Sequence, residues 1–344
     1  MKTLVITRPD DWHVHFRDNL ALHDTVFATA RHFSRALVMP NLQPALTTLQ
    51  SLLDYRERIL NALANRAAFT PFMTFYLNEK VNPKDLEDSS AYPFILGAKL
   101  YPAGATTHSE EGVTSLHALY PLFDLMQQQG LVLQIHGELN EGDIFHREAA
   151  FIEQGLVPLV TNFPRLRIVL EHISTQAAVD FVTQAPPQVA ATLTPHHLLY
   201  NRNDLLAGGL KPHLYCLPIL KKASCQRALV QAATSGNPKF FAGTDSAPHP
   251  VTQKESACGC AGIYSAPYAL ALYAECFAKA NQLDKLNPFL AHFGADFYHL
   301  PPNRETLQLQ QVTQKIPPTL PLGEETVIPI AAGLPIEWSV HENA

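Results

Sequence analysis

Eight short apolar runs, rich in β-branched or aromatic residues, recur along this chain, and segments of helical length separate most of them. We predict strands at residues 12–16, 36–39, 69–77, 94–100, 131–136, 167–172, 189–194 and 240–244. Amphipathic stretches predict helices at 20–33, 49–66, 114–129, 144–159, 176–183 and 223–235. Apolar strands that alternate with helices imply a parallel sheet covered by helices. Eight such units predict an α/β fold, a (β/α)8 TIM barrel.

A doubly wound open sheet is the alternative fold. Neither GxGxxG nor GxxxxGK[ST] follows a predicted strand, which removes the usual nucleotide-binding forms of that alternative. The 344 residues are 47% hydrophobic, enough for one large core or two ordinary ones. We expect a single domain over residues 1–344, in which the Pro-rich residues from about 300 to 344 form a C-terminal extension packed on the barrel.

Charge and cysteine content exclude several classes of protein. The net charge is -6 and no basic run indicates a nucleic-acid partner or an anionic membrane. No apolar segment is long enough to span a bilayer, and the N-terminus lacks the apolar stretch of a signal peptide. The five cysteines are scattered and odd in number, so we interpret them as reduced thiols. We therefore expect a cytoplasmic protein with neither nucleic-acid nor membrane partners.

Two histidines, His13 and His15, alternate on the first predicted strand. Side chains two residues apart on a strand point to one face, so both imidazoles are placed to bind one metal ion. Arg17 continues on that face, in position to hold an anion beside the metal. The alternative is that two surface or core histidines alternate by chance.

Further polar residues follow other predicted strands, at the barrel end where enzymes of this fold carry their chemistry. A lone histidine at a strand end is more often a hydrogen-bonded structural residue, and a lone aspartate is usually a cap. Four histidines and one aspartate at one barrel mouth, however, form a ligand set suited to Zn²⁺ or a similar ion. The polar residues at the strand ends are His13, His15, Asn41, Lys99, His136, His172 and Asp245.

Lys99 differs from the others because an ammonium group is repelled by metal ions. A buried lysine shifts its pKa readily and can react as the neutral amine. Reaction with CO₂ would give an anionic carbamate whose two oxygens can bridge two metals. The alternative is a lysine that pairs with a carboxylate or binds a substrate anion.

This set of residues resembles that of the amidohydrolase superfamily, which has HxH on strand 1, lysine on strand 4, histidines on strands 5 and 6 and aspartate on strand 8. Longer strings narrow the resemblance to the short, single-domain dihydroorotases of bacteria, and they extend over nearly the whole chain. The strings are RPDDWHVHFRD at 8–18, MPN at 39–41, KLYPA at 99–103, ATT at 105–107, RN at 202–203, PHLYCLPILK at 212–221, GTDSAPH at 243–249, CGCAG at 258–262 and WSV at 338–340.

The resemblance implies reversible, zinc-dependent cyclisation of N-carbamoyl-L-aspartate to L-dihydroorotate with loss of water, the third step of de novo pyrimidine (UMP) biosynthesis. It implies two Zn²⁺ ions per subunit, bridged by hydroxide and by Lys99 as N6-carboxylysine. One ion is held by His13, His15 and Asp245, and the other by His136 and His172. Asp245 is then also the catalytic acid and base.

The resemblance also implies a substrate pocket, whose residues are Arg17, Asn41, His136 and His249 together with backbone groups at Leu217 and Ala261. Thr106 and Thr107 belong to a flexible loop, 103–109, that closes on substrate. A homodimer is expected. Gly104 and the pair His196 and His197 are not fixed by the family pattern. The alternatives are a hydantoinase-like or phosphotriesterase-like hydrolase with the same metal site, and a non-catalytic scaffold on this fold.

Overall fold

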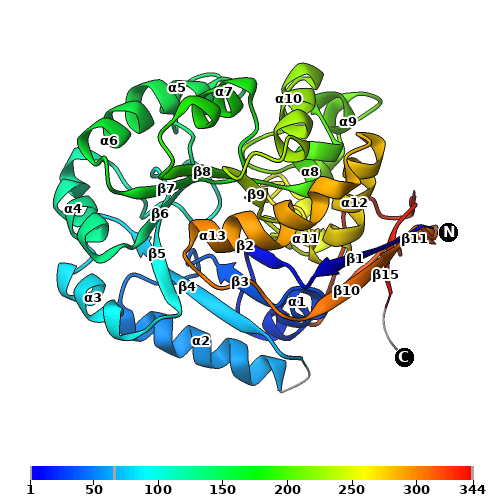
Figure 1. The fold of residues 1–344 in the computed structure, drawn as a ribbon, viewed down its shortest axis with the longest axis horizontal. Coiled ribbons are helices and arrows are strands. Elements are labelled where there is room, and N and C mark those ends of the chain that lie inside the picture. The colour runs from blue at the N-terminus through cyan, green and yellow to red at the C-terminus, as the bar shows by residue number, and fades with distance from the viewer. Residues whose placement is uncertain (1, 65–66, 342–344) are drawn as a thin grey trace.

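The computed structural model describes residues 2–64 and 67–341, and its centre is a barrel of eight parallel strands in sequential order (Figure 1). The barrel closes where the chain after β9 meets β2: the Asp245 N–H donates to the His13 carbonyl (2.9 Å) and the His15 N–H to the Ser246 carbonyl (3.0 Å). All eight predicted strands and the barrel are confirmed, and the open sheet is wrong. The strands are β2 Asp10–Val14, β3 Arg35–Val38, β4 Thr70–Leu77, β5 Ile95–Leu100, β6 Val132–Ile135, β7 Arg167–Leu170, β8 Val189–Leu193 and β9 Phe240–Ala242.

Helices surround the barrel (Figure 1) and cover its outer face. Thr48 begins α2 by accepting a hydrogen bond from the Ser51 N–H, and Gly130, in the left-handed conformation (φ 72°), ends α4. None of the helices in the described part of the chain combines the length and apolar character needed to cross a bilayer. The α-helices are α1 Leu20–Ala30, α2 Leu49–Leu63, α3 Pro83–Asp88, α4 Tyr120–Gln129, α5 Arg147–Phe151, α6 Val157–Asn162, α7 Gln176–Gln184, α8 Pro195–Leu199, α9 Arg202–Leu206, α10 Ala223–Thr234, α11 Val251–Lys254, α12 Ala269–Lys279 and α13 Phe293–Phe297.

Four predicted helices differ in detail from the observed ones, and the first of them, predicted at 20–33, ends at Ala30. The stretch at 144–159 begins later, at Arg147, and joins α5 to α6 through a π-helical segment, Ile152–Leu156. The stretch at 114–129 begins with a 3₁₀ turn, His117–Leu119, before α4. The helix predicted at 49–66 ends at Leu63, and residues 65 and 66 lie outside the described residues.

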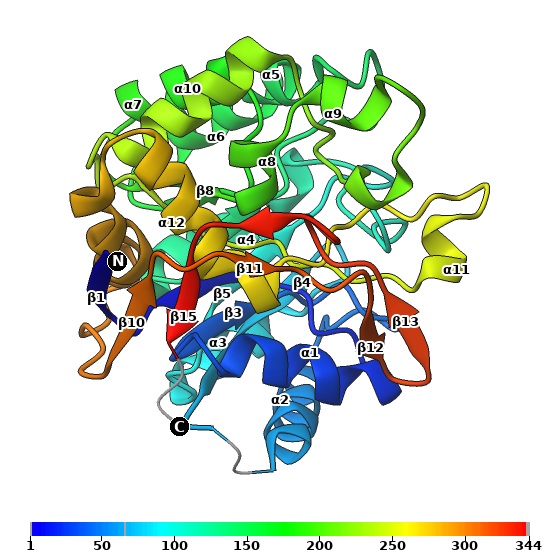
Figure 2. The same cartoon turned by 90° about the vertical axis from the view of Figure 1, so that its right-hand side faces the viewer.

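The chain after the barrel folds back on it as short antiparallel strands (Figure 2). Two of these strands form a three-stranded sheet with β1 (Thr3–Thr7). Its central strand, β10 (Thr306–Gln310), pairs with β1 and with β15 (Ser339–His341). Two further pairs are β11 (Gln314–Lys315) with β14 (Pro335–Ile336) and β12 (Leu320–Leu322) with β13 (Glu325–Val327). Leu322 and Val327 form a small core with Tyr264 and Ala266. That residues 1–344 are one domain stays a prediction, and 342–344 lie outside the described residues.

Aromatic rings fill the barrel end opposite the site. Trp12, on β2, stacks on Tyr298 with ring centroids 4.4 Å apart and on Phe72 at 6.3 Å. Helix α13 closes this end, and its Gly294 lies so close that an added Cβ would be 2.0 Å from the Trp12 Nε1 atom. Apart from the buried ion pair between Arg35 and Asp10, the packing at this end is largely apolar, and the predicted metal ligands lie at the other end of the barrel.

We predict that Gly294→Ala lowers the free energy of unfolding by about 1–3 kcal/mol, because the new methyl group displaces a fully packed indole ring. Urea unfolding followed by tryptophan fluorescence measures the change. Asp296→Ala, at an exposed position of the same helix, is the matched control and is expected to have little effect. Equal stability of Gly294→Ala and wild type would contradict the packing described here.

Candidate metal centre

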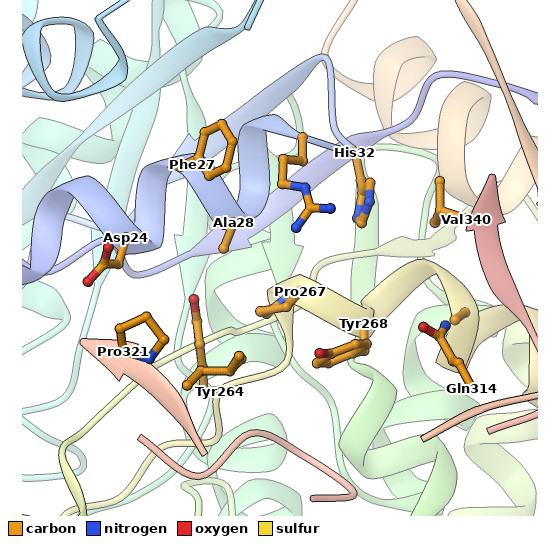
Figure 3. A pocket seen from close by; sticks show the side chains of 13 residues that line it. Asp24, Phe27, Ala28, His32, Tyr264, Pro267, Tyr268, Gln314, Pro321 and Val340 are labelled. Carbon is orange, nitrogen blue, oxygen red and sulfur yellow. The ribbon is translucent and has the colours of Figure 1, made fainter. Parts of the chain in front are cut away.

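A small pocket at the carboxyl ends of the barrel strands gathers most of the residues predicted from the sequence. Its lining contains metal-ligand candidates, anion-binding candidates and both loop threonines: His13, His15, Arg17, Asn41, Tyr101, Thr106, Thr107, His136, His172, Leu217, Asp245, Ala247, Ala261 and Gly262. A separate pocket on the barrel flank, lined in part by Asp24, Tyr264, Tyr268 and Gln314 (Figure 3), contains none of the predicted site residues.

His13 and His15 reach the pocket by a less regular path than simple alternation. Strand β2 ends at Val14, and its pairing with β3 shifts register between Asp11 and Val14. Arg17 has a left-handed backbone (φ 61°), so it enters the pocket from a turn. The prediction that Arg17 continues the strand face is wrong, although Arg17 does line the pocket.

Three donor atoms lie together at the bottom of the pocket. The Nε2 atoms of His13 and His15 are 3.1 Å apart, and the Asp245 Oδ1 atom is 3.3 Å and 3.2 Å from them. Four ligands around one ion, with bonds of roughly 2.0–2.2 Å, lie about 3.4 Å from one another. These residues therefore fit a single tetrahedral divalent ion.

Burial and mutual charge set the protonation of this cluster. Burial lowers the pKa of His13, but the carboxylates of Glu171 and Asp245 outweigh it and raise that pKa to about 9. Burial raises the pKa of Asp245, but His13 and His15 hold it well below its usual range. Burial lowers the pKa of His15 to about 4. Without a metal, the cluster thus combines an ionised Asp245 and a neutral His15 with a protonated His13, which must release its proton to act as a ligand.

Glu171 is a functional residue that the sequence analysis missed. Its Oε2 atom is 3.0 Å from the His13 Nδ1 atom, and both side chains are buried. A carboxylate on the far nitrogen of a metal-binding histidine fixes the orientation of the ring. The signal available in the sequence was a charged residue directly before His172 at a buried strand end.

Lys99 lies on β5 and is fully buried. Its ammonium group donates to the Glu171 carboxylate, so the unmodified lysine adopts the alternative weighed above, pairing with a carboxylate. Burial lowers the pKa of Lys99, which favours the neutral amine. Carboxylation of Lys99 stays a proposal.

His136 and His172 lie beside the first cluster. Their ring centroids are 4.8 Å apart, and the ring of His172 is 5.0 Å from that of His13. In the described part of the chain, the buried His172 Nδ1 atom has no hydrogen-bond partner. The His136 Nε2 atom is 3.2 Å from the Glu138 Oε2 atom, so this ring pairs with a carboxylate and not with the donor cluster.

Positive charge and hydrogen-bond donors occupy the other side of the pocket. Arg17 donates through Nε to the Pro248 carbonyl (2.9 Å), and its Nη2 atom is 2.9 Å from the His249 Nε2 atom. Burial and the adjacent Arg17 lower the pKa of His249 to about 2, so this imidazole is neutral. Asn41 donates to the Thr107 carbonyl at 3.1 Å, which holds the loop over the pocket.

The pair His196 and His197 forms a third group of possible ligands with Cys216. His197 uses both ring nitrogens in hydrogen bonds, at 2.8 Å to the Thr194 hydroxyl and 2.9 Å to the Pro218 carbonyl. Its ring therefore fastens the start of α8 to the chain near Leu217, a structural role.

Comparison with known proteins agrees with this geometry. The amidohydrolase family profile matches residues 5–286. The chain is 54% identical to the dihydroorotase of Nitrosococcus oceani over 342 residues, 99% of each chain. It is 53% identical to the dihydroorotase of Coxiella burnetii over 347 residues, 100% of each. The chain belongs to the dihydroorotase family. It is therefore a cyclic amidohydrolase of a metal-dependent family, and the resemblance noted from the sequence is confirmed.

Solved structures show the same relationship. The dihydroorotase of Campylobacter jejuni has a TM-score of 0.91 and 34% identity, with 99% of this chain and 98% of that chain covered. The dihydroorotase of Saccharomyces cerevisiae, in complex with 5-fluoroorotic acid, has a TM-score of 0.89 and 34% identity, with 99% of each chain covered. An L-hydantoinase from Arthrobacter aurescens, at 17% identity and a TM-score of 0.80, shares the fold, with 98% of this chain and 83% of that chain covered.

We predict that Glu171→Gln weakens zinc binding about 10–100-fold, because an uncharged amide holds the His13 ring less firmly and no longer raises its basicity. Competition with a chromophoric chelator measures this affinity. Glu148→Gln is the matched control: Glu148 is equally buried but accepts from the Ser174 N–H and the Thr175 hydroxyl and contacts no predicted ligand. Unchanged zinc affinity in folded Glu171→Gln would refute the positioning role.

Proposed function

We propose that this protein catalyses the reversible cyclisation of N-carbamoyl-L-aspartate to L-dihydroorotate with loss of water, the third step of pyrimidine biosynthesis. One observation carries the proposal: three candidate metal-ligand side chains and Arg17 line the same small pocket, and His249 contacts the guanidinium group of Arg17 beside it. The reaction requires both, because it forms an amide from a carboxyl group while a second carboxylate must be held in place.

The proposed cofactor is a pair of Zn²⁺ ions. His13, His15 and Asp245 would hold one ion, His136 and His172 the other, and carboxylated Lys99 would bridge them. Nitrogen and oxygen donors of this kind suit zinc. When bound, the ions lower the pKa of water and polarise a carbonyl group.

Asp245 is the proposed catalytic acid and base. Its carboxylate is ionised because His13 and His15 lower its pKa, and the ionised form is the one that a base requires. In cyclisation it takes the proton from the ureido nitrogen that attacks the carboxyl carbon. In hydrolysis it returns a proton to the ring nitrogen that leaves.

Arg17, Asn41 and His249 would bind the substrate carboxylate that does not react. A guanidinium group offers a planar fork that matches a carboxylate, and the neutral His249 supports it from the side. Backbone groups of Leu217 and Ala261, which also line the pocket, would hold the ring amides. His136 lines it as well and would contact the substrate from the metal side.

Thr106 and Thr107 would act as a lid over the reacting groups. The Thr107 hydroxyl donates to the Ala261 carbonyl at 3.3 Å, and the backbone of Thr107 contacts Asn41, so the loop already reaches across the pocket. Excluding water favours condensation over hydrolysis. The proposal includes a cytoplasmic homodimer that has neither nucleic-acid nor membrane partners.

The direct test follows ultraviolet absorbance while the purified protein is incubated with L-dihydroorotate in buffer that contains zinc and bicarbonate. We expect loss of dihydroorotate that prior chelation abolishes and added zinc restores. Absence of turnover by metal-replete protein in both directions would refute the function. A preference for uncharged cyclic amides would instead select a hydantoinase-like activity.

We predict that Asp245→Asn reduces kcat about 10²–10⁴-fold, because the amide cannot accept the proton. Metal analysis of the same preparation must accompany the assay, since Asp245 is also a proposed ligand. Bound zinc close to the wild-type level with turnover lost supports the proton-transfer role. Substantial turnover by the variant would show that another group moves the proton.

A further inference from the structure

Lys254, at the end of α11, makes an unusual set of contacts for a buried charge. The residue is 2% exposed, and its ammonium group donates to three backbone carbonyls, those of Tyr215 (2.8 Å), Cys260 (2.8 Å) and Gly262 (3.0 Å). A buried ammonium is normally paired with a carboxylate, and none lies within ion-pair distance of Lys254 among residues 2–64 and 67–341. Its three N–H donors are instead matched by three acceptors.

The three carbonyls belong to two segments that both border the substrate pocket. Tyr215 lies two residues before Leu217, and Cys260 and Gly262 lie on either side of Ala261. Leu217 and Ala261 line the pocket. The ammonium group therefore joins the two places where the backbone is proposed to hold the ring amides.

The contacts also fix the direction of the Ala261 carbonyl. The carbonyls of Cys260 and Gly262 point to Lys254, whereas that of Ala261 lies 3.3 Å from the Thr107 hydroxyl and 3.1 Å from the His249 Nε2 atom. Gly262 packs closely against a neighbouring segment, since an added Cβ would be 2.4 Å from the Ala247 carbonyl oxygen. Its N–H also donates to the Tyr215 carbonyl at 3.0 Å.

We propose that Lys254 is a positioning residue for substrate recognition: by clamping three carbonyls, it sets the spacing and direction of the Leu217 and Ala261 backbone groups that bind the substrate ring. The inference rests on the proposed function for the identity of the ligand. Lys254 touches neither the substrate nor the metal donors, so it acts through the two segments it joins.

The charge needed for this role is present at neutral pH. Burial lowers the pKa of Lys254 to about 8, although the nearby Cys216 and Cys260 side chains partly oppose this shift. The protonated amine therefore predominates near pH 7 and keeps all three donors.

The chain contains a matched control in Lys239. Its ammonium group also donates to three carbonyls, those of Val182 (3.1 Å), Thr183 (3.4 Å) and Ala185, at the end of α7. Lys239 directly precedes β9, at the barrel end away from the pocket. Lys239→Met thus removes the same type of interaction without touching the site.

The experiment compares Lys254→Met, Lys254→Arg and Lys239→Met with wild type in zinc-replete buffer. For Lys254→Met we expect KM for L-dihydroorotate to rise about tenfold or more, kcat to change less than about threefold, and zinc content to be unchanged. Hydrogen exchange of the amides at 258–262 should accelerate. The KM of Lys254→Arg should lie between those of Lys254→Met and wild type, and Lys239→Met should keep the wild-type KM.

A wild-type KM in folded Lys254→Met overturns the proposal, as does an equal rise in Lys239→Met, because either shows that only general stability is involved. Should Lys254→Met not fold, Lys254→Gln replaces it, and a wild-type KM there has the same meaning. If wild type does not turn over dihydroorotate, the proposed function fails separately. Hydrogen exchange at 258–262 then still decides whether Lys254 holds these segments, and unchanged exchange overturns the clamp.

Discussion

The buried carboxylate of Asp11 joins the first barrel strand, β2, to the chain that follows the last, β9, and the geometry of the site depends on that junction. Its Oδ1 atom accepts from the Thr244 N–H (2.8 Å) and the His13 N–H (3.2 Å), and its Oδ2 atom accepts from the Thr244 hydroxyl (2.6 Å). Burial raises the pKa of Asp11 to about 6, so the three hydrogen bonds only partly offset the cost of desolvation. The same hydrogen bonds hold the end of the last strand against the first strand, beside the candidate metal ligands.

This junction explains why residues more than 200 positions apart form one cluster. Asp245 follows Thr244 directly, and His13 is two residues after Asp11. Fixing Thr244 against β2 therefore brings the Asp245 carboxylate to the His13 and His15 imidazoles. Neighbouring residues of this strand contribute to opposite ends of the barrel. Trp12 packs among aromatic rings at one end, and His13 lies among the candidate metal ligands at the other.

The sequence predicted what depends on local pattern and strand order. The eight apolar runs predicted the barrel, and the polar residues that follow them predicted the set of candidate metal ligands. Contacts made across the fold were not predictable. Asp11 and Glu171 contact partners on other strands, and the sheet formed by β1, β10 and β15 consists of short strands with many exposed residues. The register shift in β2 and the turn at Arg17 likewise depend on neighbouring strands.

Three site residues, Arg17, His172 and Asp245, have left-handed backbone conformations, with φ of 61°, 43° and 44°. Such conformations cost non-glycine residues about 1–3 kcal/mol each and persist only where surrounding contacts enforce them. Those contacts are present: the His172 N–H donates to the Thr192 hydroxyl at 2.8 Å, and the Asp245 N–H donates to the His13 carbonyl. At each of these three positions, a sharp turn aims one side chain into the pocket. The stability of the packed barrel thus maintains the strained turns, and the turn at Asp245 brings its carboxylate to the His13 and His15 imidazoles.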